Sequence, residues 1–171
     1  MTTYTENPFT MVYDALWDMM ERNTTLTGLI RKANRIKYAQ ANATKPAISD
    51  GDLPELALLS SGGDSNVMNT SSTSSMVRRY TWAIATGEYQ INPFYNTVSW
   101  ELYRAMIDWD QVLCALVWPA GGTWHFVVRT NVISIEEGTM MMDENRGIMG
   151  WAGMWGIDVE MHFNTDDLRI T

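Results

Sequence analysis

The sequence predicts an α+β protein whose mostly antiparallel sheet is packed by an N-terminal helix and a central helix. Two stretches carry apolar residues at spacings of three and four, which is typical of helices. Other stretches alternate apolar and polar residues, which is typical of strands. The elements follow one another in the order α-β-β-α-β-β, and the 171 residues suit one domain. We therefore expect 1–171 to form a single α+β domain.

The first helix is predicted from about Pro8 to Arg22, because Asn7 can cap it and proline is tolerated in a first turn. Its apolar face is made by residues spaced three and four apart, namely Met11, Val12, Ala15, Leu16 and Met19. Asn23 ends this helix and begins a short apolar turn through Ile30. The basic residues that follow, 31–38, lead into a short strand or an extended segment.

Two strands and a loop are predicted next. Leu53–Leu59 reads as a strand, and Pro54 indicates an edge or a strand start because proline has no amide hydrogen to donate. Residues 60–75 are nearly all small and polar, so we expect a flexible loop rich in Ser, Thr and Gly. Met76–Thr86 alternates and predicts a long strand. Residues 39–52 are predicted to be a loop.

The second half of the chain predicts one helix and two further strands. From Thr97 to about Leu116, one apolar stripe predicts the central helix; its members are Val98, Leu102, Met106, Trp109 and Leu113. A strand is expected from Trp124 to Thr130, with a continuation through Ile135. The last strand is expected over Trp155–Phe163, and nearby glycines at 150, 153 and 156 suggest a bulge or a close backbone approach.

Composition narrows the class of protein without naming a function. The formal charge is 12 − 20 = −8, divided between +1 in residues 1–50 (6 − 5) and −9 in residues 51–171 (6 − 15). Such acidity argues against broad nucleic-acid binding. The apolar stretches are too short for a membrane span, the N-terminus lacks the pattern of a secretory signal, and one cysteine excludes a disulfide framework. The 13 Met and 8 Trp suit contact surfaces as well as cores.

No catalytic, metal or cofactor site emerges from the motifs. Cys114 with a histidine could form a nucleophile and base, but its apolar neighbours favour a buried, inert thiol. His162 with Asp158 and Glu160 shares one strand face, yet no metal-binding spacing is present and a solvated acidic face is favoured. The sequence Gly62-Gly63-Asp64-Ser65 lacks the ending of a phosphate loop.

What remains is a set of candidate contact residues, typical of a subunit that works by assembly. A basic run could touch nucleic acid or an acidic patch on a neighbouring subunit, and Leu53 lies on the predicted edge strand. Three consecutive methionines cannot all point inward, so the Met and Trp clusters belong to core or interface. The interface candidates are Arg31, Lys32, Arg35, Lys37, Leu53, Asp64, Met140, Met141, Trp151 and Trp155.

The order of elements, with several short motifs, resembles one family. Leu26-Thr-Gly28-Leu-Ile30 closes the first helical region, and Asp52-Leu-Pro54-Glu-Leu56 opens a strand. Ala83-Ile-Ala-Thr-Gly87 ends the long strand, and a helix of the form Trp100-Glu-Leu-Tyr…Met106 follows. This layout resembles the tail terminator and neck proteins of long-tailed bacteriophages, small α+β proteins that cap the tail tube and join it to the head.

The resemblance implies a homo-oligomeric ring, a hexamer in this family, located at the neck of the virion and assembled in the host cytoplasm. Its partners would be the tail tube protein and the head–tail connector or stopper, with no membrane, enzyme activity or cofactor. Genomic DNA would pass through an acidic lumen without specific binding, and the lumen candidates are Glu136, Glu137, Asp158 and Glu160. Edge strands near Leu53 or Trp124 could pair across subunits, and the 60–75 loop would order on docking.

Two alternatives stay open at this point. The first is another head–tail joining, adaptor or minor capsid protein, such as a stopper or a tail completion protein. The second is a small enzyme or ligand-binding domain whose site a single sequence does not reveal.

Overall fold

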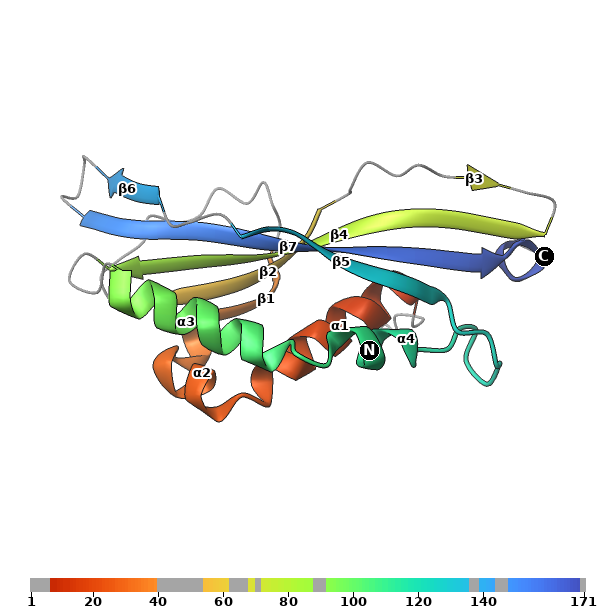
Figure 1. Cartoon of the computed structure of the whole chain (residues 1–171), viewed down its shortest axis with the longest axis horizontal. Helices are drawn as coiled ribbons and strands as arrows, with labels where there is room; N and C mark the ends of the chain where they lie inside the picture. The colour runs from red at the N-terminus through yellow and green to blue at the C-terminus, as the bar shows by residue number, and fades with distance from the viewer. Residues whose placement is uncertain are drawn as a thin grey trace.

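The computed structural model describes residues 7–39, 54–61, 68–69, 72–87, 92–135, 139–143 and 148–169. The fold is α+β, as predicted (Figure 1). The helical elements are α1 (Pro8–Glu21), α2 (Thr24–Leu29), η1 (Lys32–Asn34), α3 (Asn92–Ala105), α4 (Trp109–Cys114) and η4 (Thr165–Leu168). The strands are β1 (Arg35–Ala39), β2 (Glu55–Ser61), β3 (Met68–Asn69), β4 (Thr73–Gly87), β5 (Val127–Ile135), β6 (Thr139–Asp143) and β7 (Ile148–Asn164).

Two long strands form the spine of the sheet. β4 and β7 pair antiparallel without a register shift from Thr73–Asn164 to Gly87–Gly150. The sheet order is β1-β2-β4-β7-β5, with β3 paired to β4 and β6 paired to β7. Only β1 and β2 run parallel among the described pairs, so the predicted antiparallel character is confirmed. At about 3.4 Å per residue, a strand as long as β4 extends roughly 50 Å.

The four α-helices cover one face of this sheet, and the core lies between the two layers (Figure 1). α1 begins at Pro8 as predicted, and Asn7 caps it by accepting a hydrogen bond from the amide of Thr10. Its apolar face is buried against the helix-facing side chains of β4 and β7. Those side chains are Tyr80, Trp82, Ile84, Ile157, Val159, Met161 and Phe163. The alternation predicted for both strands is therefore confirmed.

The central helix differs from its prediction, because it is two helices joined by a turn over residues 106–108. The amide of Met106 bonds to the carbonyls of Leu102 and Tyr103, and the amide of Trp109 bonds to the carbonyl of Met106. This turn keeps Met106 buried and leaves the apolar stripe unbroken. Because the stripe continues through the turn, spacing alone could not reveal the break.

The strand predicted over Leu53–Leu59 is an inner strand rather than an edge. β2 begins at Glu55 and lies between β1 and β4. Pro54 precedes the first ladder position, so its missing amide hydrogen costs the sheet nothing. The short extended segment after residue 34 is a true strand, β1, and takes the edge position.

Three other strand boundaries differ from the predictions. β4 begins at Thr73, and β3 pairs with its residues Ser74 and Ser75. Parts of the predicted 60–75 loop are therefore strands. Residues 62–67 and 70–71 lie outside the described residues. The methionine run forms β6, and β7 begins at Ile148 instead of Trp155. The predicted bulge is on β5 instead, where the register shifts opposite Gly156.

Candidate assembly surfaces

The predicted basic run divides into two buried or paired residues and two exposed ones. Arg35 donates to Glu21 of α1 over 2.7 Å, and only 8% of its side chain is exposed. Lys37 pairs with Asp14 of α1 over 2.8 Å. These two ion pairs therefore link β1 to α1. Arg31 and Lys32 are exposed and form no ion pair within the described part of the chain, which leaves them available for a partner.

The acidic candidates on β7 lie on the sheet face opposite the helices. Asp158 sits directly across from Arg79 of β4, with 3.1 Å between Arg79 Nε and Asp158 Oδ1. Glu160 pairs with Arg129 of β5 over 3.3 Å and with His162 Nε2 over 3.0 Å. Each carboxylate thus has a cross-strand arginine, and the described part of this face is a ladder of matched charges. Glu136 and Glu137 lie outside the described residues.

The remaining sequence candidates lie on β6 and β7 or outside the described residues. Met140 is the register partner of Trp151, and Met141 is the partner of Gly150. Trp151 and Trp155 lie on β7 at the positions opposite Thr86 and Trp82 of β4. The register therefore brings the methionine run beside Trp151, whereas Trp155 lies further along β7, between Trp82 of β4 and Ile135 of β5. Leu53 and Asp64 are not among the described residues.

The sheet has two edges, and they are unlike. Within the described residues β1 pairs only with β2, while β5 pairs only with β7. β1 has five residues in a parallel ladder, and β5 has nine in an antiparallel one. Each therefore offers a row of amide and carbonyl groups on its outer side. β5 follows Trp124, whose indole Nε1 donates to the carbonyl of His162 over 2.9 Å.

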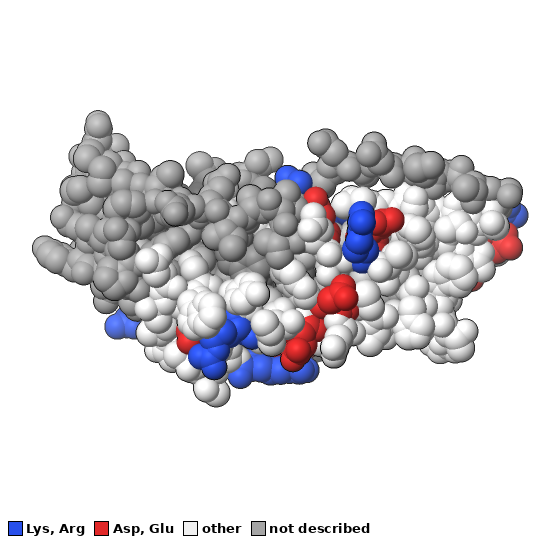
Figure 2. Space-filling view, in the orientation of Figure 1, with Lys and Arg blue, Asp and Glu red and all other residues white. Residues whose placement is uncertain are grey.

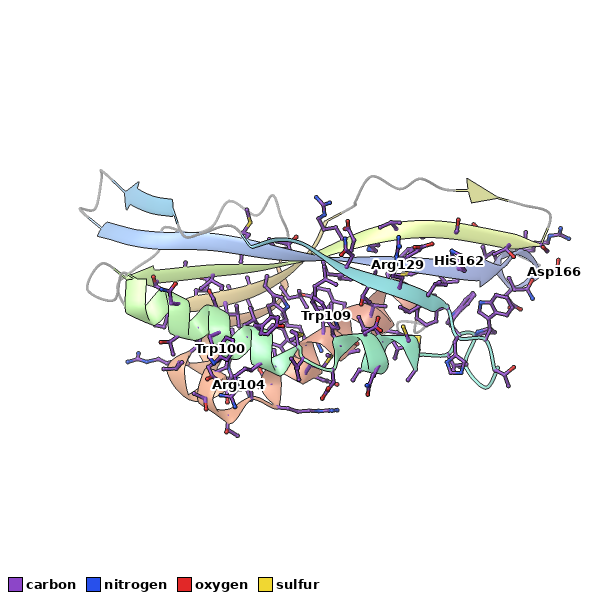
Figure 3. All side chains as sticks on the ribbon, in the orientation of Figure 1. Trp100, Arg104, Trp109, Arg129, His162 and Asp166 are labelled. Atoms are coloured by element: carbon purple, nitrogen blue, oxygen red, sulfur yellow. The ribbon has the colours of Figure 1, made fainter. Side chains whose placement is uncertain are left out.

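An exposed aromatic face on α3 was missed by the sequence interpretation. Trp100 is 58% exposed and stacks on Tyr103, with ring centroids 5.9 Å apart. Ile107, just after the helix, is 62% exposed. Arg104 lies one turn after Trp100 in the same helix (Figure 3). The sequence could have predicted this surface, because Trp100, Tyr103 and Ile107 do not belong to the buried apolar stripe that begins at Val98. Apolar residues opposite a buried stripe indicate a contact surface.

A cleft of about 410 Å³ lies between the ends of α1 and α3 and the start of α2. Its buried carboxylate, Glu101, accepts hydrogen bonds from Asn23 Nδ2 over 3.0 Å and from Arg104 Nη1 over 2.9 Å. These polar groups are satisfied by one another, which suits a structural joint better than an acid–base pair. The cleft is lined by Met19, Arg22, Asn23, Thr24, Thr25, Glu101, Arg104, Ala105, Ile107, Asp108 and Val112.

Chemistry-bearing groups are sparse over the described residues. They contain no group of three His, Cys, Asp or Glu side chains that could hold a metal ion. Cys114 is half-buried rather than buried, and its Sγ lies 3.7 Å from Asp110 Oδ1. Burial and then the neighbouring carboxylate raise the pKa of this thiol, so it is a poor nucleophile. No described helix combines the length and apolar character needed to cross a membrane.

Comparison with known proteins finds likeness in structure but none in sequence. No protein-family model matches the chain, and no curated protein matches it in sequence. The fold is similar to a chain in the solved structure described as "Virion of native gene transfer agent (GTA) particle", with a TM-score of 0.46 and 14% sequence identity. That likeness covers 86% of this chain and 93% of the other.

Proposed function

We propose that this chain is a structural virion protein, a tail terminator subunit whose copies form a ring that caps the tail tube. The order of elements supports the proposal, since it resembles that family. The single observation that carries it is the pair of unlike sheet edges, β1 and β5. A sheet with two free edges exposes hydrogen-bonding groups that a neighbouring copy can pair.

The difference between the two edges favours a ring over a dimer. A two-fold dimer joins a surface to the same surface of its partner, whereas a contact between β1 of one copy and β5 of the next is head-to-tail. Head-to-tail contacts close into a ring when the rotation between copies divides a full turn. We propose that each copy supplies β5 to one neighbour and β1 to the other, in a hexamer as the family layout implies.

The charge ladder on the open sheet face suits a wall past which DNA moves. Because Asp158 faces Arg79 and Glu160 faces Arg129, the described part of this wall presents no excess of cations to hold phosphates. Figure 2 shows the blue and red side chains close together near the middle of the upper part of the molecule. We propose that this face lines the lumen, with Glu136 and Glu137 adding negative charge, and that the helices face outward.

Two measurements test this function. Mass photometry and negative-stain images of the purified protein should show closed rings, and rings added to growing tail tubes should bind one tube end and stop elongation. We expect the tail tube protein and the connector to be the two axial partners. A protein that stays monomeric at high micromolar concentration and leaves tube length unchanged would overturn the proposal. Rings that bind no tube would point to the stopper alternative.

A further inference from the structure

The side of α3 that faces away from the core is apolar and exposed. Trp100 is 58% exposed, Tyr103 44% and Ile107 62%. The rings of Trp100 and Tyr103 stack on each other, and neither lines the cleft between α1, α2 and α3. Exposed tryptophan and tyrosine gathered on one face are typical of a protein–protein interface. What this face meets in a ring follows from how neighbouring copies are joined.

The two edge strands of the sheet run in opposite directions. β5 is antiparallel to β7, β7 to β4 and β4 to β2, whereas β2 is parallel to β1. Neighbouring copies in a ring are related by a rotation, so equivalent strands point the same way when the helices of both copies lie on one face of a shared sheet. β1 of one copy is then antiparallel to β5 of the next, and the start of β1 lies toward the end of β5.

This direction brings the start of β1 toward α3 of the neighbouring copy. In Figure 1, β5 runs from right to left, and α3 lies in the left half of the molecule and passes in front of β1 and β2. η1 comes directly before β1, with Arg31 as its cap residue and Lys32 as its first residue. Both side chains are exposed and form no ion pair within the described residues. In the ring, these two cations therefore lie toward the exposed side of α3.

The two sides that would meet carry charges of opposite sign. α1, η1 and β1 with their cap residues have five cations and three carboxylates, a net of +2. α3, α4, β5, the turn between the helices and Glu160, which pairs with Arg129, have two cations and four carboxylates, a net of −2. The first set is Asp14, Asp18, Glu21, Arg22, Arg31, Lys32, Arg35 and Lys37, and the second is Glu101, Arg104, Asp108, Asp110, Arg129 and Glu160. α4 holds its charge at the β5 edge, because Asp110 accepts a hydrogen bond from Thr130 over 2.9 Å. Opposite charges favour this contact.

We propose that the exposed side of α3 binds Arg31 and Lys32 of a second copy, beside an antiparallel β1–β5 contact. A cation over the face of a tryptophan or tyrosine ring is attracted by the negative charge of that face, and most strongly by tryptophan. A two-fold contact of α3 with itself is disfavoured, because it would set two surfaces of net charge −2 against each other. The inference rests on the proposed function, since it specifies how neighbouring copies of the ring touch.

Crosslinking tests the contact directly. In a Cys114→Ala background, one variant carries Lys32→Cys and a second carries Tyr103→Cys. A short bismaleimide added to their mixture should give the crosslinked heterodimer as the main product. The matched control replaces Tyr103→Cys with Met154→Cys, because Met154 is 42% exposed, close to the 44% of Tyr103, but lies on β7. Equal yields from both mixtures would overturn the proposal, and so would an equal yield from Tyr103→Cys alone, which would indicate a two-fold contact.

A double-mutant cycle gives a second test that needs no cysteine. Arg31→Ala and Trp100→Ala should each raise the Kd of self-association about fivefold in sedimentation experiments. The double variant should lose no more than about fivefold as well, because both substitutions remove the same contact. Arg22→Ala is the matched control, since it removes the same charge from an exposed arginine outside η1, and its effect should multiply with that of Trp100→Ala. Multiplying effects of Arg31→Ala and Trp100→Ala would contradict the contact.

The outcomes separate this contact from the ring itself. Rings that form as readily in the double variant as in the wild type, without the specific crosslink, would overturn the α3 contact and leave the ring proposal standing. A wild-type protein that is monomeric at every concentration would overturn both. The specific crosslink, together with coupled effects of Arg31→Ala and Trp100→Ala, would support the contact.

Discussion

The two longest helices, α1 and α3, cover the same sheet face but use the same kinds of residue in opposite ways. Each has 14 residues, and each carries a tyrosine and a tryptophan within one turn of each other. Tyr13 and Trp17 of α1 are buried at 3% and 8% exposure. Trp100 and Tyr103 of α3 are exposed. The tyrosine and tryptophan of α1 are therefore part of the core, whereas Trp100 and Tyr103 of α3 lie on the surface.

The partners of these rings show how the difference arises. Trp17 stacks on Trp82 of β4 with ring centroids 6.0 Å apart, and Tyr13 meets Tyr80 of β4 edge-on at 6.4 Å. Burial raises the pKa of Tyr80, whose hydroxyl donates to the carbonyl of Phe9 over 3.1 Å. Among the described aromatic pairs, Trp100 and Tyr103 of α3 stack on each other and on no other ring. A surplus of tryptophan thus serves two purposes in one chain.

The largest expected effect is the loss of the buried tryptophan. Trp17→Ala should lower the free energy of unfolding by about 3–5 kcal/mol, because it removes a buried ring and leaves a cavity against Trp82. Urea unfolding followed by circular dichroism at fixed protein concentration measures the change. A loss below about 1 kcal/mol would mean that α1 contributes little to the core, and the contrast with α3 would fail.

A second prediction concerns the joint that ties the two helices together. Asn23 caps α2 by accepting from the amide of Leu26 over 2.9 Å, and it donates to both the carbonyl and the carboxylate of Glu101. Asn23→Ala should cost about 2 kcal/mol, since it removes a cap and leaves a buried carboxylate with one donor fewer.

Asn7 provides the matched control for that joint. It caps α1 through Thr10 and is exposed, and Asn7→Ala should cost only about 1 kcal/mol. Chemical denaturation of both variants gives the difference, which is the contribution of the link to α3. If the two substitutions cost the same, Glu101 would be adequately solvated without Asn23 and the joint would be an ordinary cap.

A third, smaller effect distinguishes the two tyrosines. The hydroxyl of Tyr13 donates to the carbonyl of Leu58 of β2 in the buried layer. Tyr13→Phe should therefore cost about 1 kcal/mol, the net contribution of a typical hydrogen bond. Tyr103→Phe alters an exposed ring and should leave the unfolding midpoint in urea unchanged. Equal midpoints for both variants would show that the Tyr13 hydroxyl is not held in the folded state.

The sequence was most informative where a pattern and its boundary signals coincide. The first helix was predicted within one residue, because Asn7 and Pro8 mark its start and Asn23 marks the next cap. Strand content between Tyr80 and Ile84 followed from strict alternation. The start of β7 could not be predicted, because its first residues, Ile-Met-Gly-Trp-Ala-Gly-Met, do not alternate apolar with polar side chains. Pairing with β6 and β4 supports them, and that is a tertiary effect.

The candidate surfaces were less predictable than the fold, because they depend on partners distant in sequence. The pairing of Arg79 with Asp158 spans 79 residues and is set by strand register. Arg35 of the basic run likewise pairs with Glu21 and is not available to a partner. This pairing depends on the packing of β1 on α1, which the sequence does not show. The exposed pair on α3 was within reach of the sequence, since a helical projection places Trp100 opposite the buried stripe.

The smallest expected effect on stability comes from the tryptophan on the exposed face. Trp100→Ala should change the free energy of unfolding by less than about 0.5 kcal/mol, because the ring has little core to lose. Trp100 lies beside the cleft residue Arg104, and exposed aromatic rings are enriched at interfaces. The substitution should therefore weaken self-association in sedimentation experiments while the subunit remains folded. A variant as unstable as Trp17→Ala would show that α3 also uses its tryptophan for the core, and the distinction between the two helices would be lost.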